Sequence, residues 1–176
     1  MTKIEVPTKN EVSPESQVLF DQLEKGLGMV PNLYAAIGYS SNALGSILAF
    51  SANAGKGTFS AKEIEAIKLA TSDANGCLYC KSAHTALAKM AGFSQEETNE
   101  LRKATIADPK LNALTSLARE VASKAGNVDA EVRERFFELG YDEKALFDFL
   151  AVVIAVTFTN YAYGLSQVPV DFPEVH

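Results

Sequence analysis

The stretch SAKEIEAIKLATSDANGCLYCKSAHTALAKMAGFS, residues 60–94, carries the clearest structural information in this sequence. It opens with a serine followed three residues later by a glutamate, a capping box that marks the start of a helix. The dipeptide Asn75-Gly76 then separates two patterns of helical period. We therefore expect helices over 61–74 and 77–91, joined by a turn of about two residues and packed antiparallel as an αα-hairpin.

Two cysteines and a histidine share one face of the second helix. Cys77, Cys80 and His84 stand at positions i, i+3 and i+7, so they fall on successive turns of the same face. The apolar residues Leu87 and Ala88 continue that face. Because an apolar helix face is directed at the core of a globular protein, we expect the thiols to be only partly exposed.

The antiparallel hairpin also brings a carboxylate to the level of the imidazole. Glu65 precedes Asn75 by ten residues and His84 follows Gly76 by eight, so the two lie at similar height along the paired helices. A carboxylate beside an imidazole orients the ring and holds it basic, and the ring or a bridging water can then take the proton of a thiol one turn away. The sequence predicts a relay of Glu65 and His84 beside the cysteines.

A thiol pair at this spacing is suited to reversible two-electron redox chemistry. The thiolate is the nucleophile, and a second thiol within reach resolves an oxidised cysteine as a disulfide before it over-oxidises. The residues alone leave open which cysteine attacks. Cys77 is closest to the unpaired amides at the helix start, whereas Cys80 and His84 form an i, i+4 pair.

The rest of the chain contains similar helix-capping signals, with Ser, Asp and Pro before apolar runs and Gly after them. We expect further helices near 14–27, 31–38, 41–55, 95–103, 109–125, 130–138 and 143–165. No sustained period-two pattern indicates a strand, so the predicted class is all-α, a helical bundle. With 176 residues and no linker, we expect one domain over 1–176, its core at about 14–166 and its ends, 1–12 and 167–176, loosely held.

Composition excludes several classes of partner. The net charge is −6 and no cluster of Lys and Arg interrupts it, which argues against nucleic acid. The N-terminus has no apolar segment typical of a secretory signal, so we expect a cytoplasmic protein. The longest apolar run, 149–158, is well short of the ~20 residues that span a bilayer, and we expect it to form a buried core helix without membrane contact.

Structural interpretations of the same residues compete with the functional one. The cysteines could be small buried hydrophobes, or ligands of a zinc ion, although Cys77, Cys80 and His84 are one ligand short of the usual four. Glu65 could pair with neighbouring lysines on a solvated face. The remaining histidine, His176, ends a polar tail. We expect neither a metal nor a cofactor.

The last predicted helix is rich in aromatic residues, which we interpret as core or subunit-interface filler. These residues are Phe147, Phe149, Phe158, Tyr161 and Tyr163. Asn160 is a polar residue in that apolar setting and needs a hydrogen-bond partner, for which a structural role suffices.

The spacing of a Glu, eleven residues, CxxC, three residues and a His resembles the signature of AhpD-like alkylhydroperoxidases in the carboxymuconolactone decarboxylase superfamily. The segments GMVPNLYAAIG and GFSQEE are also similar to that family, so the resemblance covers roughly residues 25–165. It implies an AhpD-like helical bundle with the CxxC at the N-terminus of a central helix. It further implies assembly into a homo-oligomer, a trimer or a hexamer.

The resemblance also assigns roles. It implies that Cys80 attacks a hydroperoxide, that Cys77 resolves the product as a redox-active disulfide, and that an external dithiol reductant resets the pair. Glu65 and His84 would form the proton relay of this antioxidant oxidoreductase. The best-known family members carry a His between the cysteines that assists the relay, whereas this sequence has Tyr79, whose hydroxyl can still donate a hydrogen bond.

Two other functions remain open on sequence grounds. A lactone decarboxylase like the namesake of the superfamily would need no CxxC, and the presence of the pair argues against that activity. The non-enzymatic alternative is a redox sensor or a metal-stabilised helical interaction module.

Overall fold

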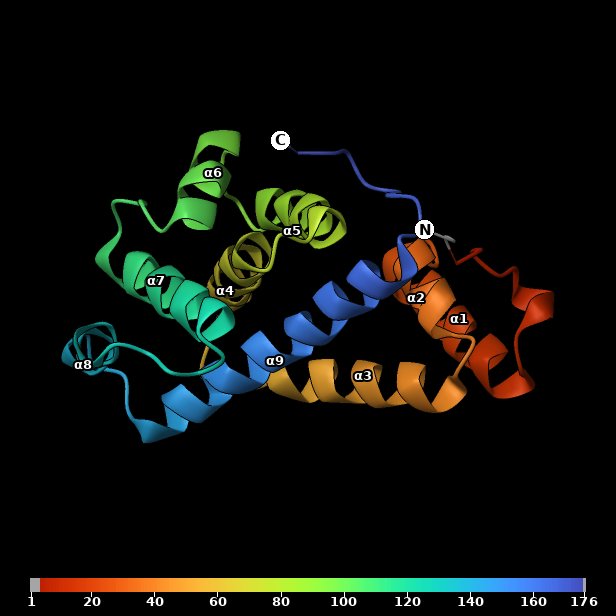
Figure 1. Ribbon diagram of the computed structural model, residues 1–176, viewed down its shortest axis with the longest axis horizontal. Helices are drawn as coiled ribbons and strands as arrows, with labels where there is room; N and C mark the ends of the chain where they lie inside the picture. The colour runs from red at the N-terminus through yellow and green to blue at the C-terminus, as the bar shows by residue number, and fades with distance from the viewer. Residues whose placement is uncertain (1–3, 176) are drawn as a thin grey trace.

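The computed structural model describes residues 4–175, and within that range every regular element is a helix (Figure 1). The helices are η1 (Lys9–Glu11), α1 (Pro14–Leu27), α2 (Asn32–Ile37), α3 (Ser41–Ala54), α4 (Ala61–Ala74), α5 (Leu78–Met90), α6 (Gln95–Lys103), α7 (Pro109–Ser123), α8 (Ala130–Glu138) and α9 (Glu143–Ser166). The predicted all-α class is therefore confirmed. The predicted α-helix boundaries agree with the observed ones to within two residues, and only η1 was not expected.

Helix α4 lies at the centre of the fold and contacts α5, α6, α7 and α9. Its apolar residues Ala66, Ile67, Leu69 and Ala70 are completely buried and point to different sides of the helix. The alanines leave room for close approach of the neighbouring helices. The carboxylate predicted for the relay therefore stands on the most enclosed helix of the protein.

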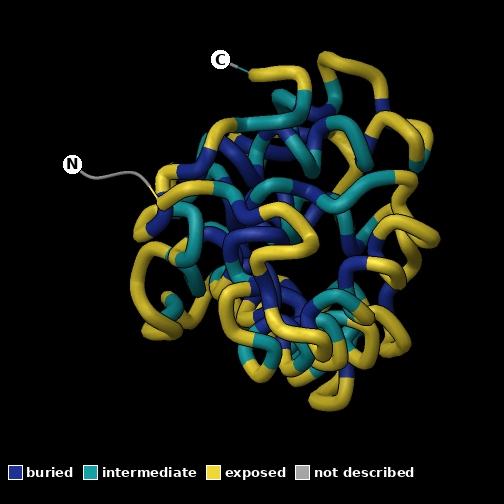
Figure 2. Tube along the Cα trace, turned by 90° about the vertical axis from the view of Figure 1, so that its right-hand side faces the viewer, coloured by how far each residue is buried: buried dark blue, intermediate teal, exposed yellow. Residues whose placement is uncertain are grey.

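The main core forms between α4, α7, α8 and the first half of α9. Leu114 of α7, Phe136 of α8 and Phe149 of α9 are at most 1% exposed, and the Phe136 ring packs edge-on to that of Phe149. Figure 2 shows the buried segments gathered in the interior of the tube, with exposed segments around them. This core holds α4 and α9 in fixed relative positions.

Helix α9 crosses the face of the molecule, from α8 at one end to α2 at the other (Figure 1). Residues 149–158 were expected to form a buried core helix, and they are buried on one side only. Val152, Val153 and Val156 face the core, but Ile154 and Phe158 are exposed, because only one side of the helix meets the rest of the fold. Within residues 4–175, α9 is the single helix whose length and apolar composition would also suit a membrane span.

The chain ends, expected to be loosely held, are packed against the helices within the described residues. Ile4 N donates to Ser166 O over 3.0 Å, and Val12 is buried. At the other end Val168 is 2% exposed and Phe172 packs edge-on to an aromatic ring of α5. The apolar residues of both segments cover surface that the helices leave open, which outweighs the entropy of ordering them. Residues 1–3 and 176 lie outside the described range.

Candidate functional site

The turn between α4 and α5 places the first cysteine at the start of a helix. Gly76 has φ +66°, a left-handed conformation that ends α4, and Cys77 N donates to Ser72 O over 2.9 Å. Cys77 is then the N-cap of α5: its Sγ accepts a hydrogen bond from Cys80 N over 3.3 Å. The first thiol therefore caps α5 and approaches the second across one turn.

Both thiols are more enclosed than expected. Cys77 and Cys80 are each 3% exposed, so the expectation of partial exposure is wrong. Leu33 of α2 and Val168 of the C-terminal segment cover them, and neither segment belongs to the hairpin from which the exposure was predicted. Burial of this kind keeps bulk water away from a reactive thiolate.

Polar groups around Cys80 favour its thiolate. The hydrogen bond from the Cys77 thiol lowers the pKa of Cys80; burial opposes this effect, and hydrogen bonding from Asn160 and Thr159 adds to it. Cys80 Sγ lies 3.8 Å from Thr159 Oγ1. The same contact with Cys80, together with burial and the negative charge of Cys80, raises the pKa of Cys77. The surroundings thus distinguish the two sulfurs, which the sequence alone did not.

The predicted neighbour of His84 is in place. Nδ1 of His84 lies 2.8 Å from Oε2 of Glu65, across the antiparallel pair α4 and α5. Burial alone would raise the pKa of Glu65, but the charge of His84 and its hydrogen bond, assisted by Lys68, lower the pKa of Glu65 to about 2. An ionised carboxylate can only accept, so Nδ1 of His84 carries the proton and Nε2 is left as the basic nitrogen when the ring is neutral.

The alternative role considered for Glu65 was an ion pair with neighbouring lysines, and one of the two lysines does pair with it. Lys68 Nζ lies 3.3 Å from Glu65 Oε1, whereas Lys62 Nζ sits 4.3 Å from the centre of the Phe93 ring. The Glu65 side chain is nevertheless only 12% exposed and uses its second oxygen for His84. Glu65 therefore does not belong to a solvated face.

No direct hydrogen bond joins His84 to either thiol within residues 4–175. The imidazole and Cys80 are one helical turn apart on the same helix, with about 5–6 Å between their Cβ atoms in ideal geometry. That spacing fits one water molecule or one polar group of a substrate between the two side chains.

Tyr79 has partners away from the relay. Its hydroxyl accepts a hydrogen bond from Leu33 N over 3.3 Å, and its ring packs against Tyr163 and Phe172. Burial and the Asp171 carboxylate raise the pKa of Tyr79. The tyrosine that replaces the family histidine thus ties α5 to α2 and to the C-terminal segment.

Sequence reasoning did not connect three polar residues near the thiols with the CxxC. Asn160 and Thr159 lie on the buried side of α9, and Ser72 lies on α4, where its Oγ accepts from Asn160 Nδ2 over 3.2 Å. A polar residue in an apolar helix was the sequence signal that could have identified Asn160 as a site residue, but we had interpreted this residue as structural.

Tyr34 was also missed. Burial, followed by the negative charges of Cys80 and Glu65, raises the pKa of Tyr34. Its ring lines an open groove of about 610 Å³ between α1 and α3. The other lining residues are mostly apolar: Leu19, Gln22, Leu23, Gly26, Leu27, Gly45, Leu48, Ala49 and Ala52.

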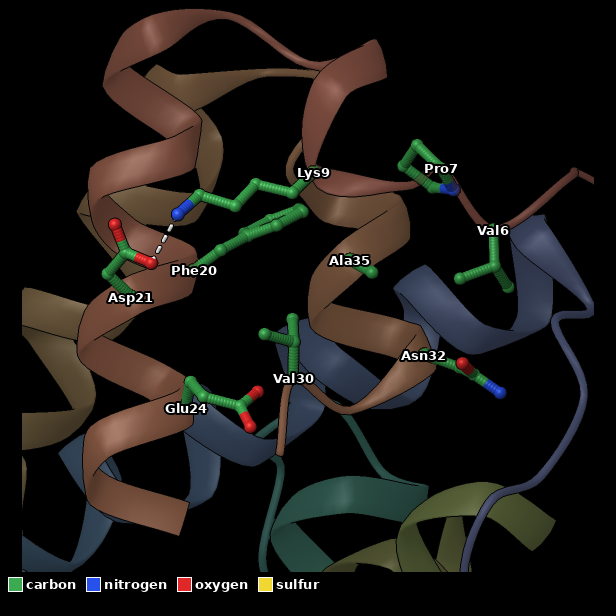
Figure 3. Close-up of a pocket in the computed structure, with 9 residues that line it drawn as sticks. All are labelled: Val6, Pro7, Lys9, Phe20, Asp21, Glu24, Val30, Asn32 and Ala35. Carbon is green, nitrogen blue, oxygen red and sulfur yellow. Dashed lines mark hydrogen bonds and ion pairs between the residues drawn. The ribbon is translucent and has the colours of Figure 1, made fainter. Parts of the chain in front are cut away.

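A second hollow, of about 410 Å³, lies between α1, α2 and the N-terminal segment (Figure 3). Lys9 and Asp21 form an ion pair across it, and Phe20 and Val30 point into it from the helix side. None of its nine lining residues is a cysteine, His84 or Glu65. Across residues 4–175, no group of three or more His, Cys, Asp or Glu side chains is arranged to hold a metal ion.

Comparison with known families gives a match over part of the chain. Residues 44–124 match the sequence profile of the Carboxymuconolactone decarboxylase family, a range that includes Glu65, both cysteines and His84. No sequence among the curated proteins matches the chain.

Several solved structures have the same fold. An uncharacterized peroxidase-related protein from Silicibacter sp. TM1040 is 21% identical with a TM-score of 0.81, over 99% of this chain and 92% of that chain. An uncharacterized peroxidase-related protein from Ralstonia eutropha JMP134, described as an alkylhydroperoxidase AhpD core, is 22% identical with a TM-score of 0.83, over 96% and 92%. A cysteine-to-alanine variant of the debrominase Bmp8, in complex with 2,3,4-tribromopyrrole, is 17% identical with a TM-score of 0.82, over 97% and 92%. At these identities the likeness concerns the fold.

Proposed function

We propose that this chain, whose residues 44–124 match the Carboxymuconolactone decarboxylase family and whose fold is similar to that of AhpD-like proteins, is a thiol-dependent peroxidase. Cys80 is the attacking thiolate, Cys77 the resolving thiol, and Glu65 with His84 the proton relay. The observation that carries the proposal is the buried contact between two thiols of opposite pKa shift, one turn from a histidine held by an ionised carboxylate.

The first step is attack of the Cys80 thiolate on the terminal oxygen of a hydroperoxide. The S–O bond forms as the O–O bond breaks, and the leaving alkoxide takes a proton from the His84 imidazolium and departs as an alcohol. Glu65 stabilises the imidazolium before the transfer. Cys80 is left as a sulfenic acid, oxidised by two electrons.

The second step closes the disulfide. Cys77 attacks the sulfur of the Cys80 sulfenic acid, the S–O bond breaks, and water leaves with the proton of the Cys77 thiol. The thiolate charge on Cys80, one of the causes that raise the pKa of Cys77, is absent once Cys80 is oxidised. Oxidation of Cys80 therefore removes one of the effects that hold the proton on Cys77.

The disulfide then needs two electrons from an external dithiol, which attacks one sulfur and releases the pair as thiols. One turnover converts a hydroperoxide and a dithiol into an alcohol, water and a disulfide. A reducing compartment such as the cytoplasm supplies this reductant, and a thiol pair is kept reduced there between turnovers.

Rapid-quench labelling of the Cys77→Ser variant tests the assignment. We expect one equivalent of an organic hydroperoxide to yield a sulfenic acid on Cys80, captured by a dimedone trap and located by peptide mass spectrometry. The Cys80→Ser variant is the matched control and should consume peroxide no faster than free cysteine. Sulfenic acid on Cys77 of that control, with none on Cys80 of the first variant, would reverse the roles.

A thiol count on the wild-type protein separates peroxidase chemistry from the competing functions. One equivalent of peroxide should remove two thiols per chain. A lactone decarboxylase would keep its activity in the Cys77→Ser, Cys80→Ser variant, and a zinc-binding module would contain stoichiometric zinc after purification and show no peroxide turnover. Either result would replace the proposal.

A further inference from the structure

The C-terminal segment, residues 167–175, is the part of the thiol cover that can move without disturbing a helix. It follows α9 without regular secondary structure and turns back toward α5 (Figure 1). Its Val168 is 2% exposed and belongs to the same apolar cluster as Cys77 and Cys80. The other residue of the cover, Leu33, lies on α2, which packs against α3 and α9. A bulky reagent therefore reaches the sulfurs most directly when the C-terminal segment moves.

Three contacts hold the segment in place, and one of them is made to the CxxC itself. Asn32 supplies two: its backbone N donates to Asp171 Oδ2 over 2.7 Å, and its Nδ2 donates to Pro169 O over 3.1 Å. The third is the edge-on contact between the rings of Phe172 and Tyr79, whose centres are 5.6 Å apart. Tyr79 stands between the two cysteines in the sequence. The segment is therefore attached to the redox pair as well as to α2.

Two features weaken the closed position of the segment. Gln167, where the segment leaves α9, has φ +52°, a left-handed conformation that costs a residue with a side chain more than it costs glycine. The second oxygen of Asp171, Oδ1, is buried and accepts no hydrogen bond from residues 4–175. A buried acceptor without a donor offsets part of what the bond to Oδ2 contributes. The closed position is therefore sensitive to the loss of any one contact.

Disulfide formation disturbs the contacts that involve the CxxC. The segment covers two free thiols, with Cys77 Sγ accepting a hydrogen bond from Cys80 N. A disulfide brings the two sulfurs to about 2 Å from each other, so at least one of them leaves its place in the cluster with Val168. The new bond also closes a ring that contains the backbone of Tyr79, and it changes the direction of the side chain that Phe172 contacts. Both apolar contacts of the segment thus depend on the oxidation state.

We propose that the C-terminal segment is a redox-coupled gate, closed over the reduced thiols and released when Cys77 and Cys80 form a disulfide. The released segment gives an external dithiol access to the oxidised pair, which the dithiol must attack at a sulfur atom. The closed segment shields the reduced pair from bulky electrophiles between turnovers. The gate rests on one element of the proposed function, the disulfide, and does not depend on which oxidant forms it.

Amide hydrogen exchange of the full-length chain in both oxidation states tests the gate. Diamide closes the disulfide without peroxide by taking two electrons and two protons from the thiol pair, and a thiol count verifies the product. The reporter is the amide of Asn32, which is bonded to Asp171 and stands in the first turn of α2. We expect it to exchange at least tenfold faster in the oxidised chain, while the amide of the core residue Leu117 keeps its rate.

The matched control is the Cys77→Ser, Cys80→Ser chain, in which diamide should leave the exchange of Asn32 unchanged. Equal exchange of this amide in the reduced and oxidised wild-type chains overturns the gate and leaves the peroxidase proposal standing, because diamide forms the disulfide independently of peroxide. A pair that diamide cannot close overturns both. Loss of thiols to diamide but not to a hydroperoxide overturns the peroxidase proposal alone.

The Phe172→Ala variant separates a gate from a fixed cover. It removes the ring contact with Tyr79 and keeps the hydrogen bonds of the segment to Asn32. In the reduced chain, we expect iodoacetamide to alkylate the thiols several-fold faster than in wild type. In the diamide-oxidised chain, we expect dithiothreitol to reduce the disulfide at the wild-type rate, because the segment is already released. Glu174→Ala, which changes an exposed residue of the same segment, should alter neither rate.

The other outcomes of this comparison contradict the gate. A cover that stays closed in both oxidation states would make Phe172→Ala speed alkylation and disulfide reduction alike. A segment that does not shield the sulfurs would leave both rates at their wild-type values.

Discussion

Asn75 Nδ2 donates a hydrogen bond of 2.8 Å to Asn160 Oδ1, which joins the turn before the CxxC to the middle of α9. Because Oδ1 accepts this bond, the amide hydrogens of Asn160 point away from Asn75. They are directed toward Ser72 Oγ and the two thiols, where they lower the pKa of Cys80. One contact between two asparagines thus orients the donor that a thiolate needs.

Replacing Asn160 by leucine should therefore raise the pKa of Cys80, because leucine has a similar branched shape but cannot donate the hydrogen bond to the thiolate. We expect a rise of about one unit, in line with a charge-assisted hydrogen bond worth ~1.5 kcal/mol, and a peroxide reaction about tenfold slower at neutral pH. The pH dependence of iodoacetamide alkylation in the Cys77→Ser background measures the pKa. An unchanged alkylation profile would mean that Asn160 is only a structural residue.

Replacing Glu65 by glutamine should slow the peroxide reaction by about 100-fold, because the imidazolium loses the charge that holds it. The pKa of Cys80 measured by alkylation should change little compared with the rate of the peroxide reaction, since His84 makes no direct hydrogen bond to the thiol. Lys68→Met is the matched control, because it removes the other partner of Glu65 but leaves the pair with His84. Equal effects of the two variants would argue against a relay.

The same carboxylate should make stability depend on acid pH. The pKa of Glu65 is about 2 in the folded chain, below the ~4.3 of an unfolded glutamate, so its contribution is fully present above pH 5 and is lost as the pH falls toward 2. The shift corresponds to a contribution on the order of 3 kcal/mol. Urea unfolding of the wild-type and Glu65→Gln chains should show a difference that shrinks over this window. A difference independent of pH would contradict the ion pair.

Removing the hydroxyl of Tyr34 should affect the substrate more than the thiolate. The raised pKa of Tyr34 keeps its hydroxyl protonated, so it is a neutral donor on a residue that lines an apolar groove. We expect Tyr34→Phe to slow reaction with cumene hydroperoxide about tenfold, the value of one hydrogen bond, and to leave the alkylation profile in place. Tyr39→Phe is the control, because its hydroxyl bonds Glu5 O outside the site. Equal rates for both variants would exclude a role for Tyr34.

The C-terminal segment should open when its anchor is removed. Asp171 Oδ2 accepts a hydrogen bond of 2.7 Å from Asn32 N at the start of α2, beside Phe172 and Val168, which cover the thiols. Asp171→Ala should therefore speed amide exchange of Asn32 and speed thiol alkylation several-fold. Glu174→Ala removes an exposed charge of the same segment and should change neither. If thiol alkylation keeps its wild-type rate in Asp171→Ala, the segment does not shield the thiols.

Local pattern was sufficient for the helices and for the contact between Glu65 and His84. Capping residues, glycines and apolar spacing determine helices through interactions within a few residues. A short turn between two helices favours their antiparallel packing. Residues at equal distance from that turn must then meet. The environment of the thiols could not be predicted in this way, because it depends on which distant segments fold over α5.

The sequence by itself determined an all-helical chain, a hairpin that gathers two sulfurs, an imidazole and a carboxylate, and the resemblance to one family. Tertiary packing decided the rest: Asn160 and Thr159 reach the thiols from α9, α2 and the C-terminal segment bury them, and one face of α9 is left apolar and open. The physical reason is the range of the interactions along the chain. Helix formation depends on neighbouring residues, whereas burial and pKa depend on groups that come together only when the core has formed.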